Sequence, residues 1–132
     1  MRKRKVRFGI SIPENLAEEL TRLSIALKTD RSSLVAEALE DFLHEKTHIL
    51  NPHLCEGVLV IAYQFENRGC ITEVLKLHDD LVVTRTHVHS NEGYCVELVY
   101  TRGLSENIRM LEAELRRVGV LRVKYLACEI NK

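Results

Sequence analysis

The spacing of hydrophobic positions changes near residue 13, from alternation to a helical period. In VRFGISI, residues 6–12, apolar residues alternate with polar or small ones, which predicts a short strand with one solvent-facing side. Pro13 can then open a helix, because the N–H that proline lacks has no partner in a first turn. Residues 14–28 predict that helix, with one apolar stripe formed by Leu16, Leu20, Leu23 and Leu27. Residues 32–43 carry a second such stripe and predict another helix, which Asp30 or a nearby serine can cap.

A strand and two helices of this length cannot bury enough apolar surface alone, and the strand would have unpaired edges. Two copies could pair their strands antiparallel and close a common helical core. The outward side of that ribbon would carry Arg7, Gly9 and Ser11 from each copy. A two-stranded ribbon fits the major groove of DNA. The free N–H groups at the start of the second helix, beside Ser32 and Ser33, would suit a phosphate.

Residues 5–44 resemble a ribbon-helix-helix DNA-binding domain in this order of elements and in Arg31-Ser32-Ser33 at the start of the second helix. The resemblance implies a dimer that reads a double-stranded DNA operator, with Arg7 contacting bases beside Gly9 and Ser11. Basic residues crowd the start of the chain and would contact phosphates: Arg2, Lys3, Arg4 and Lys5. The alternative is a helical dimerisation module that binds another protein, as in some toxin-binding proteins.

Beyond residue 44 the helical period is lost, and Asn51-Pro52 indicates a linker. The pattern that follows predicts a strand, a helix, two strands, a helix and a strand, over residues 57–65, 70–79, 81–89, 94–101, 104–119 and 120–130. This βαββαβ order is the ferredoxin-like pattern, which small ACT-type regulatory domains share. We therefore expect an α+β protein in three parts: a ribbon-helix-helix domain over 1–47, a linker over 48–56 and an ACT-like regulatory domain over 57–132.

Composition and charge narrow the classes of function. Lysine plus arginine balance aspartate plus glutamate at 19 each, so net charge alone predicts no partner. No apolar run approaches the ~20 residues of a membrane span, and none follows the basic start as in a signal peptide, so we expect a cytoplasmic protein without a membrane segment. The four cysteines form no CxxC pair, which favours free thiols. We expect no enzyme, because no oxyanion donors or phosphate loop accompany the histidines and cysteines.

The densest group of candidate metal ligands lies in THVHSNEGYC, residues 86–95. If Asn91-Glu92-Gly93 form a three-residue hairpin loop, His89 faces Cys95, His87 faces Glu97, and both histidines share one side with Cys95. A two-residue loop would place Cys95 on the other side. Two imidazoles and a thiolate suit zinc, copper or nickel, whereas a thiolate disfavours magnesium and calcium. By itself this spacing is a weak signal, since such residues also occur as ordinary strand positions.

Taken together, the two halves resemble the nickel-responsive regulators of the NikR type over nearly the whole chain. The most specific part is HDDLVVTRTHVHSNEGYCVELVYTRG, residues 78–103. In that family two histidines and a cysteine of one subunit and a histidine of a neighbour bind nickel, and His87, His89 and Cys95 match the first three. The resemblance implies a transcriptional repressor, a homotetramer assembled through the ACT-like domains, and nickel as the cofactor, with zinc or copper as alternatives.

The sequence departs from the family at position 76, where the fourth ligand is expected and Lys76 stands. A protonated lysine has no lone pair to offer a metal. His78 could supply the missing nitrogen, water could do so, or the ammonium of Lys76 could take the place of the metal's charge. In the last case the regulator would be independent of metal, or would sense a small molecule through its ACT-like domain. His78 could also simply complete the buried stripe of its helix.

Overall fold

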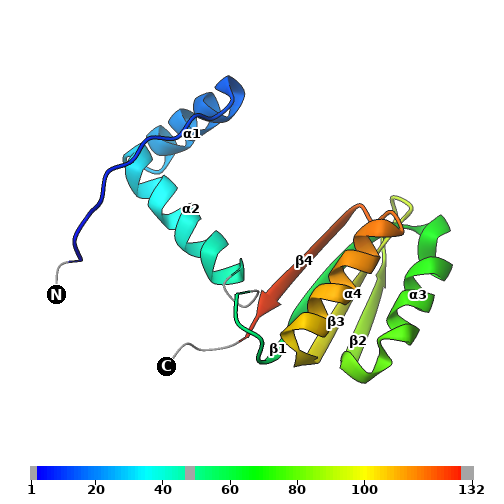
Figure 1. Ribbon diagram of the computed structural model, residues 1–132. Coiled ribbons are helices and arrows are strands. Elements are labelled where there is room, and N and C mark those ends of the chain that lie inside the picture. The colour runs from blue at the N-terminus through cyan, green and yellow to red at the C-terminus, as the bar shows by residue number, and fades with distance from the viewer. Residues whose placement is uncertain (1–2, 47–49, 129–132) are drawn as a thin grey trace. The chain divides into compact units, whose positions relative to one another are not determined.

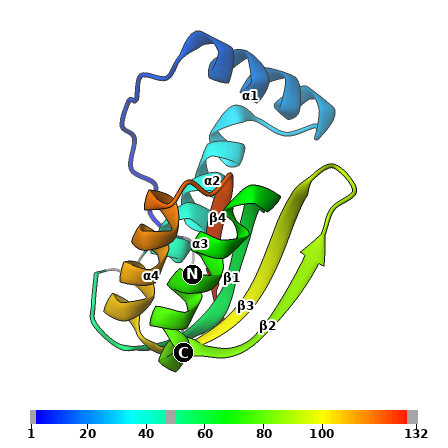
Figure 2. The same ribbon diagram turned by 90° about the vertical axis from the view of Figure 1, so that its right-hand side faces the viewer.

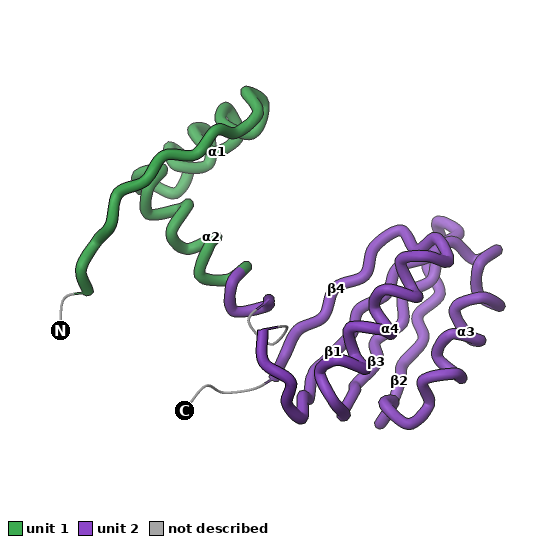
Figure 3. Tube along the Cα trace, viewed as in Figure 1, with its two compact units in different colours: residues 1–42 green, residues 43–132 purple. Residues whose placement is uncertain are grey.

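The computed structural model describes residues 3–46 and 50–128 of the chain (Figure 1). The chain forms two compact units, residues 1–42 and residues 43–132 (Figure 3). None of the helices within the described residues is both long and apolar enough to cross a lipid bilayer. The architecture is the expected α+β combination of two N-terminal helices and a C-terminal sheet with helices.

The helices of the N-terminal region are α1, Glu14–Ala26, and α2, Arg31–Lys46. The strand expected over residues 6–12 is not present in the single chain, because a strand requires a hydrogen-bonded neighbour that one ribbon strand lacks. Its inward side chains are exposed, Phe8 to 72% and Ile10 to 62%. The apolar stripes of both helices are also largely uncovered, as at Leu16, Leu23 and Phe42. This unit therefore has the surface of one half of a shared core, and pairing with a second copy stays a prediction.

Asp30, one of the residues that the sequence offers as a cap, caps α2. Its Oδ1 accepts a hydrogen bond from the Ser33 backbone N–H at 2.7 Å, and the Ser33 hydroxyl donates to Oδ2 at 3.1 Å. These bonds lower the pKa of the Asp30 carboxyl below its usual range. They also occupy the N–H and hydroxyl of Ser33 that could otherwise hold a phosphate. The cap thus stabilises the start of α2 and places a negative charge beside it.

The turn between α1 and α2 contains the one described non-glycine residue with a left-handed backbone, Lys28, whose φ is 53°. The N–H of Thr29 donates to the carbonyl of Ser24 at 3.0 Å, so the turn ends α1 with a glycine-type C-cap. We expect Lys28→Gly to raise the free energy of unfolding by about 0.5–1 kcal/mol, because glycine adopts this backbone without a Cβ clash. Urea denaturation at fixed protein concentration measures this, with Lys28→Ala as the control that keeps the Cβ. An equal gain in both variants would contradict the backbone explanation.

The C-terminal unit confirms the βαββαβ order. Its strands are β1 Leu54–Gln64, β2 Val82–His89, β3 Tyr94–Leu104 and β4 Arg122–Ala127, and its helices are α3 Arg68–Leu77 and α4 Ser105–Arg117. Short 3₁₀ turns at Phe65–Asn67 and Asp79–Leu81 flank α3. The strands form one antiparallel sheet in the order β2-β3-β1-β4. Figure 2 shows α3 and α4 together on one face of this sheet.

Several element ends differ from the sequence prediction by a few residues, among them the start of β1 and the end of α3. β1 begins at Leu54 instead of residue 57, because Leu54, Cys55 and Glu56 pair with the equally extended end of β3. α3 ends at Leu77, so His78 follows the helix as its C-cap, with φ −112° and an N–H that bonds to Val74.

The core lies between the sheet and the two helices. Alternate residues of β1, from Cys55 to Tyr63, are buried against apolar residues of α3 and α4, among them Ile71, Leu75, Ile108, Leu111 and Leu115. The opposite face of the sheet carries apolar side chains that remain exposed: Val60, Val88, Leu98 and Leu126. The C-terminal unit therefore covers only one side of its sheet by itself.

Candidate metal centre

Of the two loop lengths that the sequence leaves open, the β2–β3 hairpin has the three-residue loop. The N–H of Ser90 donates to the carbonyl of Tyr94 at 2.8 Å, and Gly93 has a left-handed φ of +87°. His87 pairs with Glu97 and His89 pairs with Cys95 across the strands. In Figure 2 the tip of the hairpin is not covered by α3 or α4. The predicted register is confirmed, and it brings the three candidate ligands to one side.

His87, His89 and Cys95 form a compact cluster. One ligand atom from each, an imidazole nitrogen or the sulfur, lies within 4.8 Å of the others. The Nδ1 atom of His89 is 3.3 Å from the sulfur of Cys95. Cys95 is fully buried while both imidazoles are exposed, so the thiol forms the floor of the cluster and the rings form its outer side. Two nitrogens and a sulfur at this spacing fit a borderline or soft transition metal.

Glu97 holds the ring of His87. Its Oε1 atom is 2.5 Å from Nδ1 of His87 and also accepts a hydrogen bond from the hydroxyl of Tyr63 at 2.8 Å. Burial, followed by the contact with Glu97, raises the pKa of the Tyr63 phenol far above its ordinary value, so the hydroxyl keeps its proton and donates. Because a carboxylate can only accept, the proton between it and His87 belongs on Nδ1, which leaves the lone pair of Nε2 for a metal.

The ring of His89 contacts the 3₁₀ turn that precedes α3. The Phe65 ring meets it edge-on, with centroids 5.1 Å apart and an interplanar angle of 72°. The guanidinium of Arg68 in turn lies 3.9 Å from the centre of the Phe65 ring. The sequence alone did not point to Phe65, Tyr63 or Arg68, because their relation to the cluster depends on how β1 and α3 meet the hairpin.

His78, the fourth candidate ligand, is not part of this cluster within the chain. Its Nε2 atom lies 2.9 Å from a carboxylate oxygen of Glu114 on α4. Lys76 is exposed on α3 and is also outside the cluster. The described part of one chain thus brings together three candidate ligands, His87, His89 and Cys95.

The described residues expected to contact DNA ahead of α1 are all exposed and lie in one segment: Lys3, Arg4, Lys5, Arg7, Gly9 and Ser11. Arg2 lies outside the described residues. No heavy atom comes within 4 Å of a Cβ added at Gly9, so the backbone there is open to close approach. Ser32 and Ser33 are exposed in the first turn of α2, where Asp30 engages Ser33.

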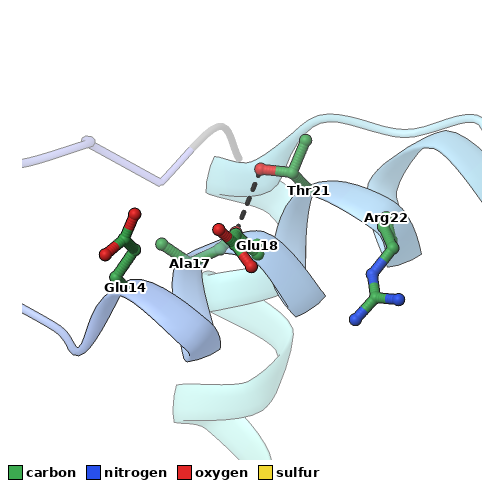
Figure 4. A pocket seen from close by; sticks show the side chains of 5 residues that line it. All are labelled: Glu14, Ala17, Glu18, Thr21 and Arg22. Atoms are coloured by element: carbon green, nitrogen blue, oxygen red, sulfur yellow. Dashed lines mark hydrogen bonds between the residues drawn. The ribbon is translucent and has the colours of Figure 1, made fainter.

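An open hollow of about 600 Å³ runs along α1 (Figure 4). Its lining comes from this one helix and consists of Glu14, Ala17, Glu18, Thr21 and Arg22. The hydroxyl of Thr21 donates to the carbonyl of Ala17 at 3.0 Å, as the dashed line in Figure 4 shows. A hollow along one side of one helix lacks the converging groups of a ligand site.

Comparison with known proteins finds a matching family domain for each half of the chain. Residues 56–127 match the NikR C terminal nickel binding domain, and residues 4–48 match a ribbon-helix-helix domain. Curated relatives bear the name "Putative nickel-responsive regulator". They include a protein of Thermococcus onnurineus, 30% identical, and one of Pyrococcus abyssi, 28% identical, with matches that cover 83% of this chain and 82–83% of theirs.

Among solved structures, the uncharacterized protein TM1266 from Thermotoga maritima superposes with a TM-score of 0.55 at 15% identity, over 58% of this chain and 100% of that one. That likeness shows a shared fold. The sequence matches over both halves carry the assignment: this chain belongs to the NikR family of nickel-responsive transcriptional regulators, which are not enzymes.

Proposed function

We propose that this protein is a transcriptional repressor that binds a DNA operator through paired ribbons and responds to nickel held by His87, His89 and Cys95. The observation that carries the proposal is the cluster itself, with three ligand atoms within 4.8 Å in a chain that also has a ribbon-helix-helix region. Zinc and copper are the alternative metals for two nitrogens and a sulfur. A regulator of this kind would act in the cytoplasm, where its operator is.

The proposed DNA contacts divide between bases and phosphates. Arg7 would hydrogen-bond to base edges in the major groove, with Ser11 beside it and Gly9 allowing close backbone approach. Lys3, Arg4 and Lys5 would contact phosphates, so binding should weaken steeply as salt rises. Ser32 is the better placed of the two serines for a phosphate contact, because Asp30 already engages Ser33.

The proposed metal ligands are the Nε2 atom of His87, the Nδ1 atom of His89 and the sulfur of Cys95. A bound metal ion would add positive charge at the open side of the hairpin and would require further ligands there. His78 of a second copy is the proposed fourth ligand, with water as the alternative. To serve, His78 would have to leave Glu114 of its own chain, which argues for a weaker site than one with a dedicated histidine.

The proposed assembly is a tetramer formed by pairing dimers through the C-terminal sheets. The exposed apolar side chains on the open sheet face, Val60, Val88, Leu98 and Leu126, supply a surface for this contact. A metal that binds one conformation of such an assembly more tightly by ~1–3 kcal/mol would produce a regulatory response at the operator.

The test is a titration of the purified protein with nickel and with zinc, followed in parallel by binding to a duplex selected from a random-sequence DNA library. We expect DNA affinity to rise as one metal fills the cluster. DNA binding that ignores both metals and a chelator would favour the second candidate, a regulator that is metal-independent or senses a small molecule. The specific observation behind that candidate is Lys76 in place of a ligand.

Arg7→Ala should weaken binding to the selected duplex by ~1–3 kcal/mol and relax its sequence preference, because a base-reading guanidinium is lost. The measurement is a fluorescence anisotropy titration against the selected duplex and a scrambled one. Lys3→Ala serves as the matched control, with a smaller loss that is equal for both sequences. Unchanged affinity of the Arg7 variant for the selected duplex would refute the assignment to the groove.

A further inference from the structure

Glu97 is a buried carboxylate whose two oxygens differ in their hydrogen bonds. The residue is 0% exposed. Oε1 contacts His87 and Tyr63, whereas Oε2 accepts no hydrogen bond from any described residue. The closest cation to Oε2 is the guanidinium of Arg85, with Nε at 3.4 Å. Arg85 is two residues before His87 on β2 and therefore shares its side of the strand.

The two side chains of the Glu97–Arg85 ion pair differ in their exposure to solvent. The Glu97 side chain is 1% exposed and cannot be hydrated, while the Arg85 side chain is 37% exposed and can reach water. A buried carboxylate requires a nearby positive charge, since its desolvation is otherwise uncompensated. Arg85 provides such a charge, with its Nε atom 3.4 Å from Oε2. A metal ion on Nε2 of His87 would be a second cation near the same carboxylate, and it would repel Arg85.

We propose that Glu97 and Arg85 set the metal affinity of the cluster in opposite directions. Glu97 is a positioning residue that holds the proton of His87 on Nδ1 and attracts the metal through that ring. Arg85 is the counter-charge that keeps the metal-free protein stable and lowers its affinity for the metal. The pair thereby sets the metal concentration to which the regulator responds. This inference rests on the proposed metal binding by the cluster.

Two substitutions separate these roles. Glu97→Gln keeps the shape and an oxygen that can accept from His87, but it removes the charge, so metal affinity should fall ~10–100-fold. Arg85→Gln removes the competing cation, so metal affinity should rise ~3–10-fold at moderate salt, and less at high salt. In the Glu97→Gln background the Arg85→Gln gain should disappear, because nothing then holds the guanidinium beside the site.

A metal-free measurement accompanies the titrations. Arg85→Gln should melt at a lower temperature than the unmodified chain without metal, since it leaves a buried carboxylate without its counter-charge. Saturating nickel or zinc should raise its melting temperature by more than it raises that of the unmodified chain. The matched control is Arg102→Gln, which removes another arginine of the same sheet from an exposed ion pair with Glu56, with Nε at 2.7 Å from the carboxylate. It should leave metal affinity unchanged.

The probes are nickel and zinc, added to the full chain with a competing chelator of known affinity. Tighter binding by Arg85→Gln, with weaker binding by Glu97→Gln, supports the proposal. Unchanged or weaker metal binding by Arg85→Gln overturns the proposal when weaker binding by Cys95→Ala shows that the cluster is the metal site. If Arg85→Gln does not fold, Glu97→Gln decides, and undiminished affinity there overturns the proposal. Absence of binding by the unmodified chain would remove the metal half of the proposed function as well.

Discussion

Replacing Cys95 with alanine is expected to abolish the thiolate-to-nickel charge-transfer absorption and to weaken nickel binding at least ~100-fold, or about 2.7 kcal/mol. Cys95 supplies the only sulfur among the three clustered ligand atoms, 3.3 Å from Nδ1 of His89. Without it two imidazoles remain, which lack both the charge and the polarisable sulfur of a thiolate. The measurement is near-ultraviolet and visible absorption during a nickel titration.

The control for this prediction is Cys70→Ala, which removes an exposed thiol from α3 and should change neither the band nor the affinity. Because Cys95 is fully buried, its alanine variant must also be shown to keep its fold by circular dichroism. A band that persists in a folded Cys95→Ala protein would remove the thiolate from the proposed site. Lack of any such band in the nickel-loaded unmodified chain would argue against a thiolate–nickel bond altogether.

Leu111→Ala is expected to destabilise the C-terminal unit by about 2–5 kcal/mol. Leu111 is 0% exposed on α4 and belongs to the cluster packed against the sheet. Truncating it loses the transfer free energy of the removed carbons and leaves a cavity that the antiparallel sheet cannot readily close. A loss of this size is a large part of the total stability of a small domain. Urea denaturation of the metal-free chain at fixed concentration measures it.

Met110→Ala is the matched control, because Met110 precedes Leu111 on the same helix and is 56% exposed. Its effect should stay within roughly 0.5 kcal/mol, as for most surface positions. Equal losses in the two variants would mean that α4 does not bury the face assigned to it. Loss of nickel binding by a folded Leu111→Ala protein would further imply that the hairpin depends on the packing of α4.

Sequence reasoning succeeded where the determining interactions are local. The order of elements in the C-terminal unit follows from hydrophobic period. Asn91-Glu92-Gly93 was one of two possible loops, and the structure selects it, with Gly93 in the left-handed backbone region. Once that loop is set, the pairing of His87 with Glu97 and of His89 with Cys95 follows, since residues opposite one another in a hairpin share a side. The core of the candidate site was therefore predictable.

Prediction from the sequence failed where the partner of a residue is distant in the chain. Tyr63 enters the site because β1 pairs with β3, which places it opposite Cys95. His78 pairs with Glu114, far along the chain on α4, which no helical period could indicate. The ribbon over residues 6–12 also depends on a neighbour, in that case a second copy, and is not present in one chain.

The amino-acid sequence by itself determined the α+β order of elements and indicated His87, His89 and Cys95 as candidate metal ligands, because helical period, alternation and turn geometry act over a few residues. Only the tertiary structure decided which groups support those ligands. Glu97 is fully buried in the folded chain, so its contacts with Tyr63 and Arg85 take the place of hydration. Burial is a property of assembled elements, so the charge balance of the site emerges only when they pack.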